Sequence, residues 1–189
     1  MDALDLLIAD HNRVRGLFKL FKDASEKDDQ STMVEVAAKM RTELEVHATI
    51  EEEIFYPAIR ELTDEVGDSV AEGLEEHHEV KVLLAELADL SADDDAWKAK
   101  WTVITENVEH HAGEEEDEMF PKVRSRTKAD WRGQLGDKLD ARKGELGAPT
   151  LADRIDLTVE QLHTLATEQE IPGRSKMSAD ELRATVSPG

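Results

Sequence analysis

The chain has 189 residues, contains no cysteine and carries a formal net charge of -21. The lack of cysteine excludes disulfides, thiol catalysis, iron–sulfur clusters and cysteine-type zinc sites, and the acidic charge disfavours nucleic acid and anionic membranes as partners. Aromatic residues make up only 4%, and Ala, Leu, Glu, Lys and Asp dominate, which favours helices over sheets. The N-terminus, MDALDLLIAD, is acidic where a signal peptide is basic, so we expect a soluble cytoplasmic protein.

Apolar residues at steps of three and four predict an all-α fold with four long helices and a shorter fifth one. Polar connectors such as SEKDDQ and SADDD separate them. Pro57 is expected to end or kink the second helix, because proline lacks an amide donor and clashes with the preceding turn. The predicted helices cover residues 2–21, 31–60, 64–90, 95–124 and 127–146.

The C-terminal part is predicted to be a separate small unit. Gly and Pro mark a linker at residues 147–155, and residues 156–189 follow as a helix, an extended segment and a second helix. Capping-box spacing at Thr158 and at Ser178 marks the two helix starts. The sequence IPGRSKM between them is expected to be extended.

One motif occurs twice in the chain. Residues 47–57 read HATIEEEIFYP and residues 111–121 read HAGEEEDEMFP, so that each His is followed by Glu after four positions and by Pro after ten. A second histidine precedes each motif, His11 by 36 residues and His77 by 34. The sequence therefore predicts a duplicated helical hairpin that carries matched nitrogen and oxygen ligands.

Both His–Glu pairs lie in the apolar stripe of a predicted helix. Residues four positions apart share one helical face, so His47 points the same way as Glu51, and His111 the same way as Glu115. A carboxylate in an apolar interior must be paired, protonated or bound to a metal. A single acidic run could be a solvated surface, but two copies, each with an upstream His, favour a metal site.

The motif residues occur in the order His11, His47-xxx-Glu51, His77 and His111-xxx-Glu115. This order resembles the hemerythrin-like HHE cation-binding domain over residues 1–146. The resemblance implies an up-and-down four-helix bundle around two non-heme irons joined by an oxo or hydroxo bridge. Two carboxylates and four imidazoles suit iron, with manganese or zinc less favoured. A ferritin-like site uses Glu-x-x-His spacing, and none of the four histidines in this set has a Glu three residues before it. The resemblance assigns bridging roles to Glu51 and Glu115 and terminal roles to His11, His47, His77 and His111.

The chain departs from the oxygen-carrying hemerythrins at one position. Those proteins have a further His one turn before the third-helix ligand, where this chain has Gly73; Leu7 is the equivalent residue beside His11. We therefore expect an open coordination position at Gly73, which favours peroxide or nitric oxide chemistry over simple oxygen carriage. The residues expected to line the pocket are Ile104, Met119 and Phe55, and ordinary core packing would explain these three positions equally well.

Several neighbours of these residues are expected to lie outside the site. His78 and His110 adjoin proposed ligands but point about 100° away from them, so surface positions are expected. Arg15 and Lys81 each follow a ligand His by four residues; they are candidates for cations that support the site, but extension into solvent is the favoured expectation. Tyr56 is expected to face away from the site on a regular helix.

The tail LTVEQLHTLATEQEIPGRSKMSADELRATV is similar to the N-terminal domain of the Rho termination factor. In that family the unit often contacts nucleic acid. Residues 152–189 hold four Arg or Lys against seven Asp or Glu, which is the wrong balance for strong phosphate binding. We therefore expect the unit to bind a partner or pack, with nucleic acid as the less favoured alternative.

The combined expectation is a di-iron protein that binds or processes a small oxidant (O2, peroxide or NO). Turnover like that of a catalase or peroxidase is one form of this function. The alternatives are a non-enzymatic oxygen or iron sensor or carrier, with the tail as its output module, and an iron buffer. No membrane partner is expected, and the sequence leaves the oligomeric state open.

Overall fold

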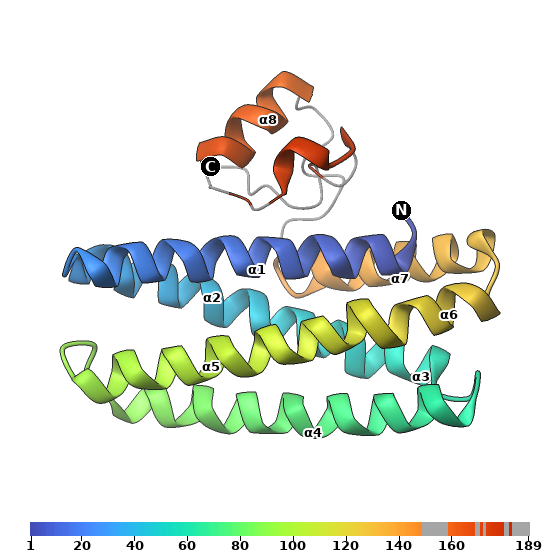
Figure 1. Cartoon of the computed structure of the whole chain (residues 1–189), viewed down its shortest axis with the longest axis horizontal. Coiled ribbons are helices and arrows are strands. Elements are labelled where there is room, and N and C mark those ends of the chain that lie inside the picture. The colour runs from blue at the N-terminus through green and yellow to red at the C-terminus, as the bar shows by residue number, and fades with distance from the viewer. Residues whose placement is uncertain (149–158, 169–170, 172, 180–181, 183–189) are drawn as a thin grey trace.

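The computed structural model describes residues 1–148, 159–168, 171, 173–179 and 182. Four long helices lie side by side and alternate in direction along the chain (Figure 1), which confirms the predicted all-α bundle. A fifth helix, α7 (Ala129–Glu145), packs on α1. Among the described helices, none is both long and apolar enough to cross a membrane. The long helices are α1 (Ala3–Glu26), α2 (Gln30–Ile50), α4 (Asp64–Glu86) and α5 (Asp95–Glu114).

Side-chain caps define the starts of three helices. The Asp2 carboxylate accepts a hydrogen bond from the Leu4 amide at 3.0 Å at the start of α1. Asp29 and Thr63 cap α2 and α4 in the same way. Such caps satisfy amides that have no partner inside the helix, and each typically contributes about 1 kcal/mol.

The ligand motifs coincide with an irregularity in the helices. α2 and α5 each pass into one π-helical turn, in which the amides of Tyr56 and Phe120 donate to the carbonyls of Glu51 and Glu115, five residues earlier. Pro57 therefore does not end the helix, because the wider turn directly before it accommodates the ring. The π turns span Glu51–Phe55 and Glu115–Met119, and the chain continues as α3 (Tyr56–Ile59) and α6 (Phe120–Arg126).

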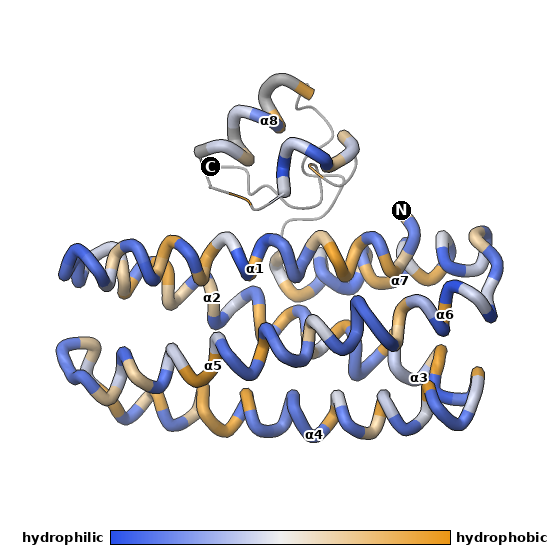
Figure 2. Tube along the Cα trace, viewed as in Figure 1, coloured by the Kyte–Doolittle hydropathy of each residue, from blue (hydrophilic) through white to orange (hydrophobic). Residues whose placement is uncertain are grey.

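Apolar side chains form two buried clusters, one on each side of the bundle's middle. In Figure 2 apolar and polar residues alternate along each long helix, as expected for helices that bury one face. One cluster includes Leu4, Leu7, Ile50, Phe55, Ile59 and Phe120. The other includes Val14, Phe18, Met40, Trp97, Trp101 and Ile104.

The C-terminal unit is described in part. Helix α8 (Val159–Glu168) confirms the first predicted helix, but the segment expected to be extended contains a 3-10 turn at Arg174–Lys176. The turn follows Gly173, whose φ of 72° lies in the left-handed region that glycine adopts readily. Thr158, most of the linker and most of the second predicted helix lie outside the described residues. The buried side chains of this unit are Leu162, Ala166, Ile171 and Leu182.

Candidate metal centre

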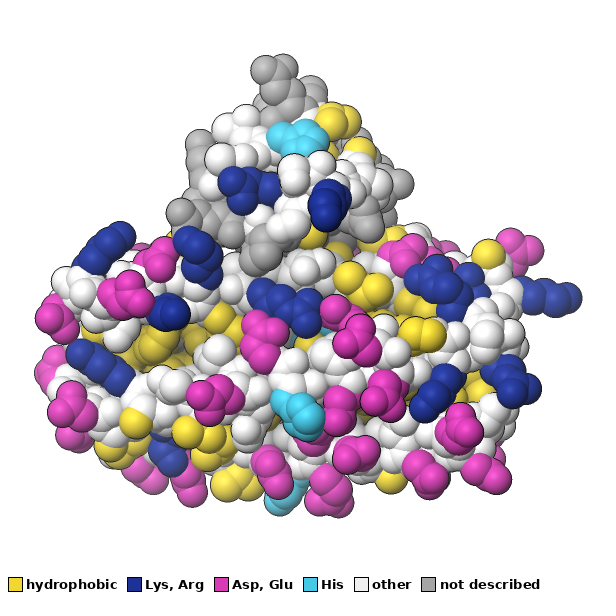
Figure 3. Space-filling view, in the orientation of Figure 1, with side chains coloured by type: hydrophobic (Ala, Val, Ile, Leu, Met, Phe, Trp, Pro, Cys, Tyr) yellow, Lys and Arg dark blue, Asp and Glu magenta, His cyan; other side chains and the backbone are white. Residues whose placement is uncertain are grey.

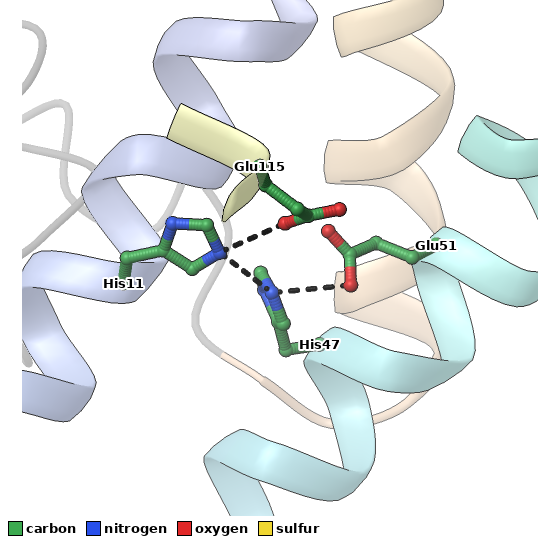
Figure 4. Close-up of side chains that lie close together, drawn as sticks. All are labelled: His11, His47, Glu51 and Glu115. Carbon is green, nitrogen blue, oxygen red and sulfur yellow. Dashed lines mark hydrogen bonds and ion pairs between the residues drawn. The ribbon is translucent and has the colours of Figure 1, made fainter. Parts of the chain in front are cut away.

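The six predicted ligands converge between the two apolar clusters. Each long helix contributes one His, and the two π turns contribute the carboxylates. Figure 4 shows four of these side chains, drawn from three segments of the chain, with their polar atoms directed toward one another. All six are buried, with exposed fractions between 0% and 7%: His11, His47, Glu51, His77, His111 and Glu115.

The imidazoles form two pairs of nearly identical geometry. The Nε2 atoms of His11 and His47 are 3.1 Å apart, as are those of His77 and His111. The ring planes meet at 64° in the first pair and 63° in the second. Because two nitrogens that share a metal at about 2.1 Å lie roughly 3 Å apart, each pair is spaced to hold one ion.

Each carboxylate connects the two pairs. In each carboxylate an Oε2 atom lies near one imidazole of each pair, and the six side chains form two donor groups that share Glu51. The Oε2-to-Nε2 distances are 3.2 Å and 3.3 Å from Glu51 to His47 and His77, and 3.3 Å and 3.7 Å from Glu115 to His11 and His111.

Glu51 shows why this cluster fits a cation. Its side chain is fully buried, and neither of its oxygens has a hydrogen-bond partner among the described residues. Burial, with the nearby charge of Glu115, raises the pKa of Glu51 well above its ordinary value. An ionised carboxylate in these surroundings costs several kcal/mol. Divalent metals bind carboxylate oxygen and imidazole nitrogen, so the residues present fit such an ion.

The pKa values of the two histidines of the first pair, His11 and His47, are shifted in opposite directions. Burial alone lowers the pKa of a histidine, but contacts with Glu115 and Glu116 outweigh it at His11 and raise its pKa to about 10. At His47 burial prevails over the contact with Asp10 and lowers the pKa to about 4. Without metal, His11 is therefore the charged ring of this pair near neutral pH and His47 is the neutral one.

A carboxylate also contacts the outer nitrogen of each imidazole. Such partners hold Nε2 toward the site by accepting the Nδ1 proton. The sequence analysis missed these four acids, although each is adjacent in sequence to a ligand and takes part in the same duplication. The Nδ1-to-oxygen distances are 2.7 Å for His11–Glu116, 3.6 Å for His47–Asp10, 3.0 Å for His77–Glu52 and 2.7 Å for His111–Glu76.

Cations from the chain neutralise several of these acids, which corrects one expectation. Arg15 donates to Glu116 at 2.8 Å, and Lys81 donates to Glu52 at 2.6 Å, so neither side chain simply extends into solvent. The contact with His77, followed by that of Lys81, lowers the pKa of Glu52 to about 2. The sequence places each cation one turn after a ligand His, but only the folded bundle brings the acid alongside.

The fifth helix provides a third cation. Lys143 of α7 is 3% exposed and forms an ion pair with Asp10. Although burial opposes it, the ion pair with Lys143 and the contact with His47 hold the pKa of Asp10 well below its usual range. Asp10 is therefore a permanent carboxylate behind His47, and α7 supports the site without contributing a ligand.

Tyr56 points into the site, contrary to the expectation. It is 1% exposed, its hydroxyl donates to Glu115 Oε1 at 2.9 Å, and its ring stacks on His77 at 5.6 Å. The π turn is the reason, because its extra residue rotates every later side chain by about 100°. Burial and the charges of Glu51 and Glu115 raise the pKa of Tyr56, so its hydroxyl keeps its proton.

The structure also shows what lies beside Gly73, where an open coordination position is predicted. A Cβ atom at Gly73 would lie 2.8 Å from the Tyr56 hydroxyl, so that hydroxyl occupies the space left by the missing side chain. Of the three expected pocket residues, Met119 lines a cleft beside Gly73, whereas Phe55 and Ile104 are packed in the cores. The surface positions of His78 and His110 agree with the prediction.

Two hollows reach the cluster from different sides. The first is a cavity of about 40 Å³ that touches all four ligand histidines. The second is a cleft of about 50 Å³ that reaches His111 and Glu115 past Gly73 and is bordered by four further glutamates. The apolar residues around the first cavity are Val14, Phe18, Leu44, Ala48, Val80, Leu84, Val108 and Ala112.

Comparison with known proteins identifies the family. The hemerythrin HHE cation binding domain matches residues 2–123. The chain belongs to this family. The match confirms the resemblance predicted from the sequence. It ends before α7, so Lys143 supports the HHE domain from outside the matched residues.

The HHE domain has relatives of different length and description. Over 146 residues the chain is 27% identical to a protein of Nostoc sp. named as a DNA nickase, and the match covers 77% of this chain but only 40% of that protein. Over 151 residues it is 28% identical to an uncharacterized protein of Mycobacterium tuberculosis, covering 79% of this chain and 90% of the relative. No solved structure gives a significant match.

Proposed function

We propose that the HHE domain holds two iron ions and uses them to bind or process a small oxidant: O2, peroxide or NO. The donor set supports iron, because it combines two carboxylates with four imidazoles in two groups that share Glu51. A bound iron pair would supply coordination positions for such a molecule and the capacity to exchange electrons with it. The ligands in this proposal are His11, His47, Glu51, His77, His111 and Glu115.

The apolar cavity at the four histidines is the observation that carries this proposal. Its lining favours a small apolar molecule over water, since apolar cavities in proteins stay dry and take up apolar guests. O2 and NO fit this description better than peroxide. An iron buffer would need the ligands but not an apolar approach to them, so the cavity favours small-molecule chemistry.

Protein groups around the centre orient its side chains. The Tyr56 hydroxyl donates a hydrogen bond to Glu115 Oε1 at 2.9 Å, which orients that carboxylate. Glu116 accepts a hydrogen bond from the outer nitrogen of His11 at 2.7 Å, and Asp10 lies 3.6 Å from that of His47, so a carboxylate stands behind each ring and Nε2 is directed inward. The site therefore needs little rearrangement when metal binds.

The function of the Nostoc relative is not part of this proposal. The shared segment covers only 40% of that protein, and a net charge of -21 opposes strong binding to a phosphate backbone. A sensor or carrier function remains compatible with the same centre. Reversible oxygenation without turnover would support a carrier or sensor, and sustained consumption of peroxide would support an enzyme.

Anaerobic iron loading followed by gas addition tests the proposal. We expect about two irons per chain by elemental analysis and a change in the optical spectrum when O2 or NO is added. Val108→Phe, which narrows the apolar cavity, should slow this change several-fold and leave the iron content intact. One iron per chain, selective zinc binding, or an iron-loaded protein that responds to none of the three oxidants would refute the proposal.

A further inference from the structure

Four carboxylates lie at the outer nitrogens of the site histidines, and three of them form an ion pair with a Lys or Arg. Glu76 is the fourth. Glu76 accepts from His111 Nδ1 through Oε2 at 2.7 Å. Among the described residues no Lys or Arg forms an ion pair with it. The cations that pair with the other three acids are Lys143 on Asp10, Arg15 on Glu116 and Lys81 on Glu52.

Two potential metal ligands, His110 and Glu114, lie beside Glu76. His110 Nε2 lies 3.9 Å from the free oxygen of Glu76, Oε1, and 3.2 Å from Glu114 Oε1. One donor atom from each of the three side chains lies within 4.8 Å of the others. The His110 side chain is 67% exposed, so the cluster is open to ions from solvent.

We propose that Glu76, His110 and Glu114 form a separate, exposed site for a divalent transition-metal cation. Two carboxylates and one imidazole are suitable ligands for Zn²⁺, Mn²⁺ or Fe²⁺, with water completing the coordination. The ion would neutralise Glu76 as Lys143 neutralises Asp10. This site goes beyond the proposed function, because none of its three ligands belongs to the buried centre.

The position of this outer site indicates what it does. Glu76 and Glu114 also border the acidic cleft, which Glu72 and Glu118 line as well and which reaches the buried His111 and Glu115. Figure 3 shows acidic side chains gathered over α4 and α5, with histidine side chains among them. Such a surface raises the local concentration of cations. The outer site is therefore placed to capture ions that load the buried centre.

Zinc binding to the full chain tests the inference, since Zn²⁺ has no redox chemistry and reports ligands alone. Wild type should bind one more Zn²⁺ per chain than His110→Ala or Glu114→Gln, measured by equilibrium dialysis and elemental analysis. His78→Ala is the matched control, because it removes an exposed histidine that also adjoins a buried ligand. The control should bind as many ions as wild type.

The same samples separate this inference from the proposed function. If His110→Ala and wild type bind equal numbers of Zn²⁺, the outer site does not exist, whatever the buried centre holds. If iron fails to load the buried centre, the proposed function fails, and the extra Zn²⁺ of wild type still reports the outer site. Buried-centre loading followed by Co²⁺ absorbance should be several-fold slower in His110→Ala, and an unchanged rate would remove the capture role.

Discussion

The two halves of the bundle, residues 1–62 and 64–126, repeat one design but differ in several side chains around the site. Both have an imidazole pair with Nε2 atoms 3.1 Å apart and a π turn that begins at the buried Glu of the motif. The aromatic residue after the π turn is Tyr56 in the first half and Phe120 in the second. Each ring stacks across on the other half, Tyr56 on His77 and Phe120 on His11.

This difference matches a second one on the facing helices. One turn before His77 stands Gly73, and the equivalent residue before His11 is Leu7. The glycine leaves the space that the Tyr56 hydroxyl occupies, whereas Leu7 and Phe120 belong to an apolar cluster. The duplication therefore preserved the six candidate ligands, and two small changes placed a hydroxyl hydrogen-bond donor on only one side of the cluster.

Removing either bridging carboxylate should have the largest effect. Glu51→Ala and Glu115→Ala each take away the group shared by the two donor sets, so iron content should fall from about two per chain to one or less. Elemental analysis after anaerobic loading measures this. Glu53→Ala is the control, because that exposed side chain pairs with Arg142 rather than with the site. Full iron content in both variants would contradict the bridging arrangement.

Exchanging the two aromatic residues tests the asymmetry directly. Tyr56→Phe leaves Glu115 Oε1 without its donor and should destabilise the metal-free protein by about 2 kcal/mol, as expected for a buried hydrogen bond to a charged group. Phe120→Tyr should also destabilise it, because Leu7 fills the equivalent space and overpacking typically costs about 1–3 kcal/mol. Urea denaturation measures both. A stabilising Phe120→Tyr would show that the halves are equivalent here.

Metal affinity should fall as the pH falls. With a pKa of about 10, His11 is protonated in the metal-free protein at neutral pH, and the raised pKa of Glu51 favours its protonated form. Ligands must lose these protons, so apparent Zn²⁺ affinity should drop up to about tenfold per pH unit for each proton released, equivalent to about 1.4 kcal/mol.

Calorimetry in buffers of different ionisation enthalpy counts the released protons. The pKa of His11 is raised from 6.5, so its contribution to the stability of the metal-free fold is complete below pH 6.5 and is lost as the pH rises through about 10. His47 does not add to proton release at neutral pH, because its pKa is about 4. Zinc binding without proton release would contradict the assigned protonation of His11.

Gly73→Ala should have the smallest effect. Its Cβ would displace the Tyr56 hydroxyl, which costs about 2 kcal/mol, while the better helix propensity of alanine returns about 1 kcal/mol. The net loss of about 1 kcal/mol should shrink in the Tyr56→Phe background, where the hydroxyl is absent. Equal losses in both backgrounds, measured by urea denaturation, would show that the hydroxyl does not occupy this space.

Most of the bundle, and the six side chains that converge at its middle, were predictable from the sequence. Apolar periodicity located the long helices, and the duplicated His–Glu spacing located the six side chains that the structure brings together. The prediction for Tyr56 was wrong because it assumed a regular helix. The π turn depends on how the chain accommodates Pro57 while Glu51 stays directed inward, and no residue pattern in the sequence marked that wider turn.

The sequence by itself determined the family, the helical architecture and the convergence of donors, because all three follow from spacing along single helices. The tertiary structure decided which charged side chains contact the site residues and the carboxylates behind them. Lys143 reaches Asp10 from 133 residues away, and Glu116 reaches His11 from 105. Such contacts depend on the separation and rotation of packed helices, which local periodicity does not specify.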